Sequence, residues 1–265
     1  MVTTVARGRW GLYLLLMAPY SIFYTLVDSL ALQQAVAWFN VRVPYRNILP
    51  VRATAYILSL LNTQLGQGGI AVYLHRRYQL PFWQITGTVL FIAFVEVYQL
   101  AFYSFVGASV GGEGRAPWLV YGIMAAYLAV HLWFFSRPRR LRFAEAPVLT
   151  AFRRARPWHY LALGLLKTPN VLAAVVVHWL ALPLFGLHVP FLALLTYLPI
   201  IFFVAALPIA AAHLGPSQFA WQFFLGGYAD GGALVAYSLA AHLTFMLMNA
   251  LIGLCFLRRA ARELG

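Results

Sequence analysis

Long apolar runs dominate the chain, and each is long enough to cross a bilayer. A run of about 18 to 20 apolar residues crosses the ~30 Å hydrocarbon layer as a helix. We predict five such spans, in the ranges 10–39, 82–110, 117–135, 158–185 and 233–257. Tryptophans lie near the ends of several of these ranges, where amphipathic rings favour the membrane interface. The pattern therefore predicts an all-α polytopic membrane protein.

Two further apolar segments are broken by glycine and proline. Residues 53–77 contain Gly66-Gln67-Gly68-Gly69, and residues 191–226 contain Leu207-Pro208 and Gly215-Pro216. Half of such a segment, about 10 to 13 residues at 1.5 Å per residue, reaches roughly to the bilayer midplane. Non-helical backbone at that depth is tolerated only inside protein or beside a wet cavity. We expect two re-entrant hairpins that line an internal cavity, and two ordinary kinked spans are the alternative.

The arginines favour the hairpins. If each broken segment enters and leaves the membrane on the same side, 15 of the 18 arginines lie on one face of the membrane. If both segments cross completely, the arginines are divided 11 to 7 between the two faces. Cytoplasmic loops carry the excess of Lys and Arg, so the first arrangement is preferred. The C-terminus and the basic loop 137–156 are then cytoplasmic, in the cell inner membrane.

Hairpins that enter from opposite leaflets indicate an inverted repeat, a construction found in many transporters. We therefore predict one transmembrane domain over residues 1–265, with halves at about 10–135 and 158–257.

Composition removes several other classes of protein. The chain is 63% hydrophobic and only 9% charged, against about 25% charged residues in a soluble domain. The net charge of +13 would indicate nucleic acid in a soluble protein, but these arginines lie in short loops between spans, where they attract anionic lipid headgroups. We therefore expect membrane lipids as partners and no nucleic acid. The single cysteine, Cys255, allows no disulfide framework, and no nucleotide-binding or nucleophile motif is present, so we expect no enzyme, cofactor or metal.

Ionisable residues inside the spans are the first candidates for a site. A charge at the bilayer centre costs about 2.5 to 3.5 kcal/mol on insertion scales, so each should face a partner or a cavity. Glu96 lies deep in its run and would contact a headgroup amine or act in proton coupling, or else serve as a paired structural carboxyl. Lys167 would bind a lipid phosphate or snorkel to the basic face, and Asp28 is a possible partner for it.

Polar residues at the first broken segment are the second candidates. Arg52, Arg76 and Arg77 flank it and would collect a lipid phosphate at the cavity mouth, or act only as topology anchors. Its amide residues would hydrogen-bond a headgroup or satisfy backbone groups at the turn; they are Asn62, Gln64 and Gln67.

The first broken segment, with Asn62-Thr63-Gln64-Leu65-Gly66-Gln67-Gly68-Gly69 followed by His75-Arg76-Arg77, resembles the lysylphosphatidylglycerol synthetase/flippase transmembrane family. The second, with Leu207-Pro208-Ile209 and Gly215-Pro216, is similar to that family's later signature. The resemblance spans roughly residues 15–260, and one N-terminal helix of that family has no counterpart here. It implies a flippase-like fold with Pro208 at the second turn.

Together these features predict a lipid transporter that moves or binds anionic or zwitterionic headgroups. The alternative is a non-catalytic membrane subunit that docks a lipid-modifying enzyme on the basic loop 137–156. A membrane enzyme acting on a lipid-linked substrate is a third hypothesis.

Overall fold

A computed structural model describes residues 8–111, 118–136, 145–206 and 215–264. Helices make up 88% of it, and the described ranges contain no strand. Four helical stretches are long and apolar enough to cross a membrane: α2 (Trp10–Phe39), α5 (Phe82–Gly111), α8 (Pro157–Ala181) continued by η4 (Leu182–Phe185), and α11 (Gly231–Leu264). The predicted all-helical class is therefore confirmed, and four helices have the length and composition of membrane spans. The fifth predicted span forms α6 (Trp118–Ser136), and its crossing of a membrane stays a prediction.

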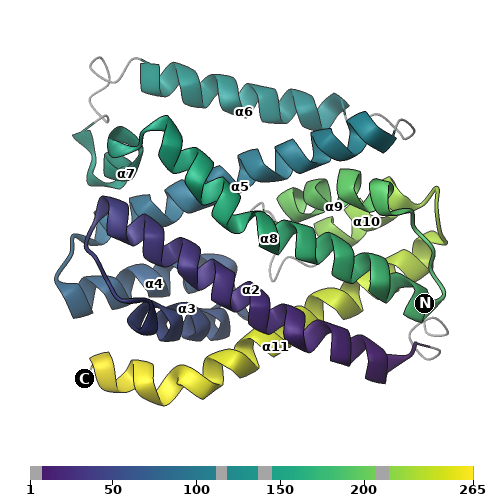
Figure 1. The fold of residues 1–265 in the computed structure, drawn as a ribbon, viewed down its shortest axis with the longest axis horizontal. Helices are drawn as coiled ribbons and strands as arrows, with labels where there is room; N and C mark the ends of the chain where they lie inside the picture. Colours follow the sequence, from purple (N-terminus) through teal and green to yellow (C-terminus); the bar gives the residue numbers. More distant parts are fainter. Residues whose placement is uncertain (1–7, 112–117, 137–144, 207–214, 265) are drawn as a thin grey trace.

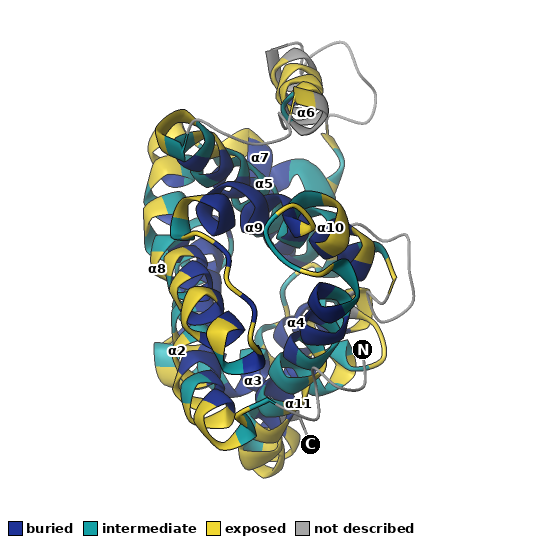
Figure 2. Ribbon diagram, turned by 90° about the vertical axis from the view of Figure 1, so that its right-hand side faces the viewer, coloured by how far each residue is buried: buried dark blue, intermediate teal, exposed yellow. Residues whose placement is uncertain are grey.

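The surface of these helices is apolar, and part of the interior is charged. Leu15 is 71% exposed, and Leu161 and Leu165 are 66% and 63% exposed. Asp28 and Lys167 are instead buried among the helices. Figure 2 shows the exposed residues on the outer faces of the bundle and the buried ones facing inward, with α6 at the periphery, where it contacts α5. Contiguous apolar exterior surface is expected where lipid replaces water.

The first broken segment is a helix–turn–helix unit. It consists of α3 (Tyr45–Ser59) and α4 (Thr63–Tyr78), so it begins earlier than the predicted residue 53. The predicted break at Gly66–Gly69 is wrong, because these residues lie inside α4 and the turn falls at Leu60–Asn62. A Cβ on Gly66 would lie 2.0 Å from Ser59 Oγ and 2.8 Å from the Ala55 carbonyl oxygen. The glycine therefore allows α4 to approach α3 closely.

The second broken segment also contains two helices. Helices α9 (Phe191–Ala206) and α10 (Pro216–Leu225) pack against each other. Gly215, with a positive φ of 99°, precedes Pro216 at the first position of α10, so the predicted interruption at Gly215-Pro216 is confirmed. Leu207 and Pro208, the other predicted interruption, lie outside the described residues.

The two units open at opposite ends of the molecule (Figure 1). Helices α2 and α8 are antiparallel: the Arg9 N–H donates to the Leu184 carbonyl at one end (3.1 Å), and the Trp38 and Trp158 rings lie 5.3 Å apart at the other. The α3–α4 unit starts and finishes at the end where α2 stops. The α9–α10 unit starts and finishes where α2 begins.

Packing in the two halves corresponds element by element. Helix α3 of the first half packs on α11, and α9 of the second half packs on α5. Glycine mediates both contacts, since a Cβ on Gly253 would lie 2.4 Å from the Ala53 carbonyl oxygen and one on Gly107 would lie 2.6 Å from the Thr196 nitrogen. In the same way, α2 of the first half contacts α11 of the second half, and α8 of the second half contacts α5 of the first half.

The sequence carries a trace of this repeat at a separation of 150 residues. Leu15-Leu16-x-x-Pro19 in α2 corresponds to Leu165-Leu166-x-x-Pro169 in α8. Further along the same helices, Val27-x-x-Leu30-Ala31-Leu32 corresponds to Val177-x-x-Leu180-Ala181-Leu182. Both prolines lie inside their helices. The two halves therefore correspond in the order of their helices and in the contacts between them.

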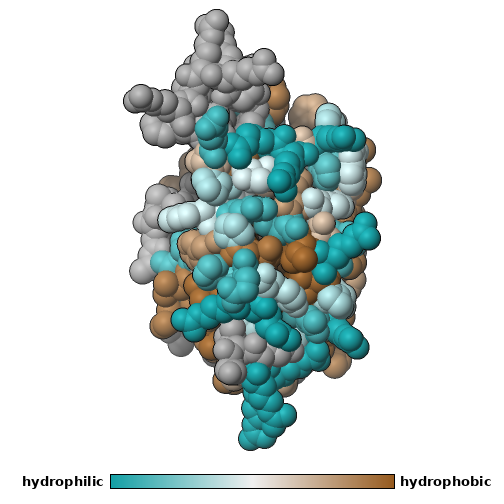
Figure 3. Space-filling view, turned by 90° about the vertical axis from the view of Figure 1, so that its left-hand side faces the viewer, coloured by the Kyte–Doolittle hydropathy of each residue, from teal (hydrophilic) through white to brown (hydrophobic). Residues whose placement is uncertain are grey.

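Basic side chains gather at one end of the molecule. Figure 3 looks onto this end, where hydrophilic side chains cover much of the face. Arg9 lies at the opposite end, beside Leu184. Ten of the described arginines lie where α2, α4 and α11 finish and α3 and α8 begin: Arg42, Arg46, Arg76, Arg77, Arg153, Arg154, Arg156, Arg258, Arg259 and Arg262.

Candidate functional site

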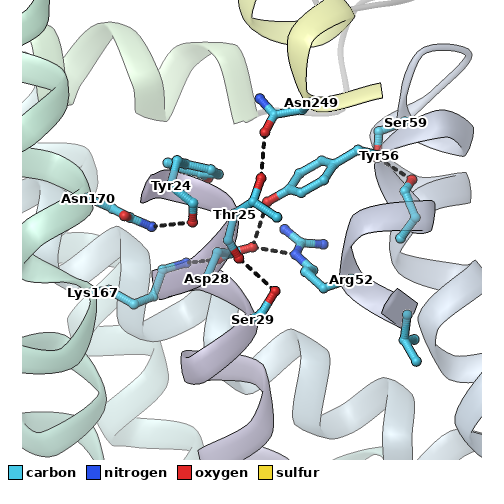
Figure 4. Close-up of polar contacts among 12 residues, drawn as sticks. Tyr24, Thr25, Asp28, Ser29, Arg52, Tyr56, Ser59, Lys167, Asn170 and Asn249 are labelled. Carbon is cyan, nitrogen blue, oxygen red and sulfur yellow. Dashed lines mark hydrogen bonds and ion pairs between the residues drawn. The ribbon is translucent and has the colours of Figure 1, made fainter. Parts of the chain in front are cut away.

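Four charged side chains from four helices form a continuous chain of ion pairs. Asp28 lies near the middle of α2, and its carboxylate accepts a hydrogen bond from Arg52 Nε of α3 (Figure 4). Lys167 of α8 lies 3.2 Å from the other Asp28 oxygen and 2.8 Å from Glu96 Oε2 of α5. We call Arg52, Asp28, Lys167 and Glu96 the ion network. In the order Arg52, Asp28, Lys167 and Glu96, positive and negative charges alternate, and they sum to zero when all four groups are ionised.

The ion network joins the two halves of the repeat. Asp28, Arg52 and Glu96 belong to the first half, and Lys167 belongs to the second. Removing one partner of a buried ion pair typically costs about 3 to 5 kcal/mol, because the other charge is left uncompensated. The network therefore holds α2, α3, α5 and α8 in one arrangement.

Burial differs between the inner and outer members of the network. The side chains of Asp28 and Lys167 are each 4% exposed. The side chain of Arg52 is 17% exposed, and that of Glu96 is 38% exposed. The two ends of the network, one cationic and one anionic, are therefore the parts that a ligand can reach.

Neutral polar groups support the charges. Tyr56 of α3 donates its hydroxyl to Asp28 Oδ2 at 2.9 Å, and the Arg52 guanidinium lies 4.7 Å from the centre of the Tyr56 ring. One turn before Asp28, Thr25 donates to Asn249 Oδ1 of α11 at 2.8 Å. Hydrogen bonds fix the carboxylate from one side, and a cation–π contact fixes the guanidinium.

Three of the predicted site residues meet in this network: Arg52, Glu96 and Lys167. The possible pairing of Lys167 with Asp28 is confirmed. The expectation that Arg52 flanks the first hairpin as a loop arginine is wrong, because it lies within α3 and faces α2. A guanidinium that faces the interior of an apolar helix bundle needs a buried acid, and Asp28 provides it.

The remaining predicted residues lie away from the network. Arg76 and Arg77 are exposed in the last turn of α4. Asn62 caps the start of α4 by accepting a hydrogen bond from the Gln64 backbone N–H at 2.7 Å, and both side chains are exposed. Gln67 is half-buried within α4. Pro208 lies outside the described residues, as does much of the basic loop 137–156.

Sequence reasoning missed several supporting residues, namely Thr25, Tyr56, Asn170 and Asn249. Each is a polar side chain inside an apolar helix, and this is the signal that a search for partners of Asp28 could have used.

The comparisons with known proteins add no family. No family model matches the chain, and the search of curated proteins finds no match. In the described part of the chain, no group of three or more His, Cys, Asp or Glu side chains is placed to hold a metal ion. The ion network is therefore the feature from which function has to be argued.

Proposed function

We propose that this protein is a flippase-like lipid transporter whose ion network binds the headgroup of an anionic or zwitterionic phospholipid. The observation that carries the proposal is a chain of four charged side chains among apolar helices, with Asp28 and Lys167 buried and Arg52 and Glu96 partly accessible at its ends. Charges at this depth are expensive and most often mark a substrate or ion pathway. Arg and Lys are the usual partners of phosphate, and a carboxylate is the usual partner of an amine.

The architecture supports passage of a headgroup. The helix pairs α3–α4 and α9–α10 open at opposite ends of the molecule, and α3 contributes Arg52 to the network. Transporters often build their substrate sites from interrupted helices of opposite orientation. The apolar outer faces of the spans would leave the acyl chains in the bilayer. The resemblance to the lysylphosphatidylglycerol synthetase/flippase family agrees with this proposal. Since the sequence contains no ATP-binding motif, movement would be facilitated or ion-coupled.

The arginine distribution supports an orientation in the cell inner membrane. Ten described arginines lie at the end where α2 stops, and the excess of arginine marks the cytoplasmic side. We propose that this end, with the C-terminus, is cytoplasmic and that both helix pairs, α3–α4 and α9–α10, are re-entrant.

Leaflet exchange in reconstituted vesicles tests the proposal. Fluorescent phospholipid is placed in both leaflets, and dithionite then bleaches the outer leaflet and whatever reaches it. We expect wild-type protein to raise the bleached fraction well above that of empty vesicles. Arg52→Gln should lower the exchange rate, because the network loses its accessible cation. Arg77→Gln removes the same charge from the exposed end of α4 and is the matched control.

Wild-type rates equal to those of empty vesicles would contradict transport. Equal losses in Arg52→Gln and Arg77→Gln would contradict the assignment of the site to the network.

A further inference from the structure

The charge balance of the network restricts the ligand that it can accept. Two cations and two carboxylates already neutralise one another in this protein interior. A ligand of net negative charge would add an uncompensated charge to a poorly solvated site, which is unfavourable. A ligand that carries both charges can exchange partners at both ends, with its anion at Arg52 and its cation at Glu96, and leave the total unchanged.

Two buried amide oxygens near the network are without hydrogen-bond donors. Within the described residues, Gln99 Oε1 and Asn170 Oδ1 are buried and accept no hydrogen bond. Gln99 follows Glu96 by three residues on α5, and Asn170 follows Lys167 by three residues on α8, so each lies one helical turn from the Glu96–Lys167 pair.

The orientation of both amides is fixed by their nitrogens. Gln99 Nε2 donates to the Gly164 carbonyl at 2.7 Å, and Asn170 Nδ2 donates to the Tyr24 carbonyl at 3.4 Å. Turning either amide over would point its oxygen at a carbonyl oxygen, so the unpaired atoms are acceptors. A buried acceptor without a donor is destabilising, and a ligand that brings N–H groups would relieve this cost.

We propose that the site selects a zwitterionic phospholipid with a phosphate and a primary ammonium group, the phosphatidylethanolamine class. The ammonium binds at Glu96 with Gln99 and Asn170 as additional acceptors, and the phosphate binds at Arg52. A choline headgroup has no N–H to donate to these oxygens, and a glycerol headgroup brings no cation for Glu96. This inference rests on the proposed function and specifies its substrate.

Binding and exchange are measured in parallel. Native mass spectrometry of purified protein reports bound phosphatidylethanolamine, phosphatidylcholine and phosphatidylglycerol with matched acyl chains, and the vesicle assay reports their exchange. We expect wild-type protein to prefer phosphatidylethanolamine roughly tenfold in both, the ratio that one charge-assisted hydrogen bond supplies.

Two near-isosteric variants test the acceptors. Asn170→Leu and Gln99→Met should remove most of the preference while keeping side-chain volume. Gln84→Met, on the same helix as Gln99, replaces a glutamine whose amide bonds the Phe39 carbonyl away from the network, and it should keep the preference. This control separates a loss of selectivity from a general loss of folded protein.

Equal binding of the three lipids by wild-type protein, or an unchanged preference in Asn170→Leu and Gln99→Met, would overturn the inference. If phosphatidylethanolamine binds selectively but no lipid exchanges faster than in empty vesicles, the inference stands and the transport function fails. If all three lipids exchange equally fast, transport stands and the inference fails.

Discussion

At the scale of single residues, Asp28 shows how this protein keeps charges inside an apolar bundle. Asp28 Oδ2 accepts hydrogen bonds from Arg52 and Tyr56, and Asp28 Oδ1 forms an ion pair with Lys167. A carboxylate in this position is stable only because two cations approach it from different helices. Asp28 is therefore the centre of the network both in space and in charge.

We predict that Asp28→Asn lowers stability by about 3 to 5 kcal/mol, because two buried cations then share one carboxylate. The midpoint of thermal unfolding in detergent measures the loss. Adding Lys167→Met to this variant should cost less than Lys167→Met costs in the wild-type protein, since the remaining charges of Arg52 and Glu96 again sum to zero. Strictly additive losses in the double variant would contradict coupling of the two residues.

The pairings at this scale were only partly visible in the sequence. Asp28, Glu96 and Lys167 were recognisable as charges inside spans that require partners. Arg52 was misplaced, because an arginine beside an apolar run is usually a loop anchor. Only the packing of α3 on α2 decides that it faces Asp28.

At the scale of elements, the spans were predictable and the interruptions were less so. The predicted range 10–39 coincides with α2, and 82–110 differs from α5 by one residue. Hydropathy predicts these bounds well, because a helix that crosses lipid has to satisfy its own backbone hydrogen bonds and therefore runs unbroken through the apolar residues. Glycines in 66–69 predicted a break, yet they lie in α4, where the absence of a side chain serves close packing against α3. Sequence alone does not separate these two uses of glycine.

Two neighbouring glycines of α4 provide a test of this account. Gly66→Ala should destabilise the protein by about 1 to 3 kcal/mol, because its Cβ would overlap Ser59 and the Ala55 carbonyl. Gly68→Ala meets nothing within 4 Å and should stabilise α4 by about 0.5 to 1 kcal/mol through helix propensity. Thermal unfolding of both variants is the measurement. Equal effects of the two substitutions would show that α4 does not pack on α3 as described.

At the scale of the whole molecule, two similar halves pack with opposite chain direction. The antiparallel pairing of α2 with α8 and the exchanged contacts of α3 and α9 give this symmetry. The ion network does not follow this symmetry. At a separation of 150 residues, His178 in α8 corresponds to Asp28, and it hydrogen-bonds Tyr237 at 2.8 Å rather than joining an ion pair. The charged site is therefore placed by a symmetric scaffold but belongs to one side of it.

Cysteine labelling tests the arrangement of the ends. In a Cys255→Ser background, His75→Cys and Arg258→Cys should react with an impermeant thiol reagent from one side of the membrane. Arg9→Cys and His188→Cys should react from the other side, since these exposed positions lie at the opposite end. Labelling of His75→Cys and Arg9→Cys from the same side would rule out the proposed topology.

The most direct test of the central claim is a cryo-electron microscopy structure of the protein in nanodiscs that contain phosphatidylethanolamine. We predict headgroup density within hydrogen-bonding distance of the Arg52 guanidinium and the Glu96 carboxylate, with the acyl chains running out between the helices. Headgroup density confined to the outer rim of the molecule, with the network closed by its own side chains alone, would contradict the account.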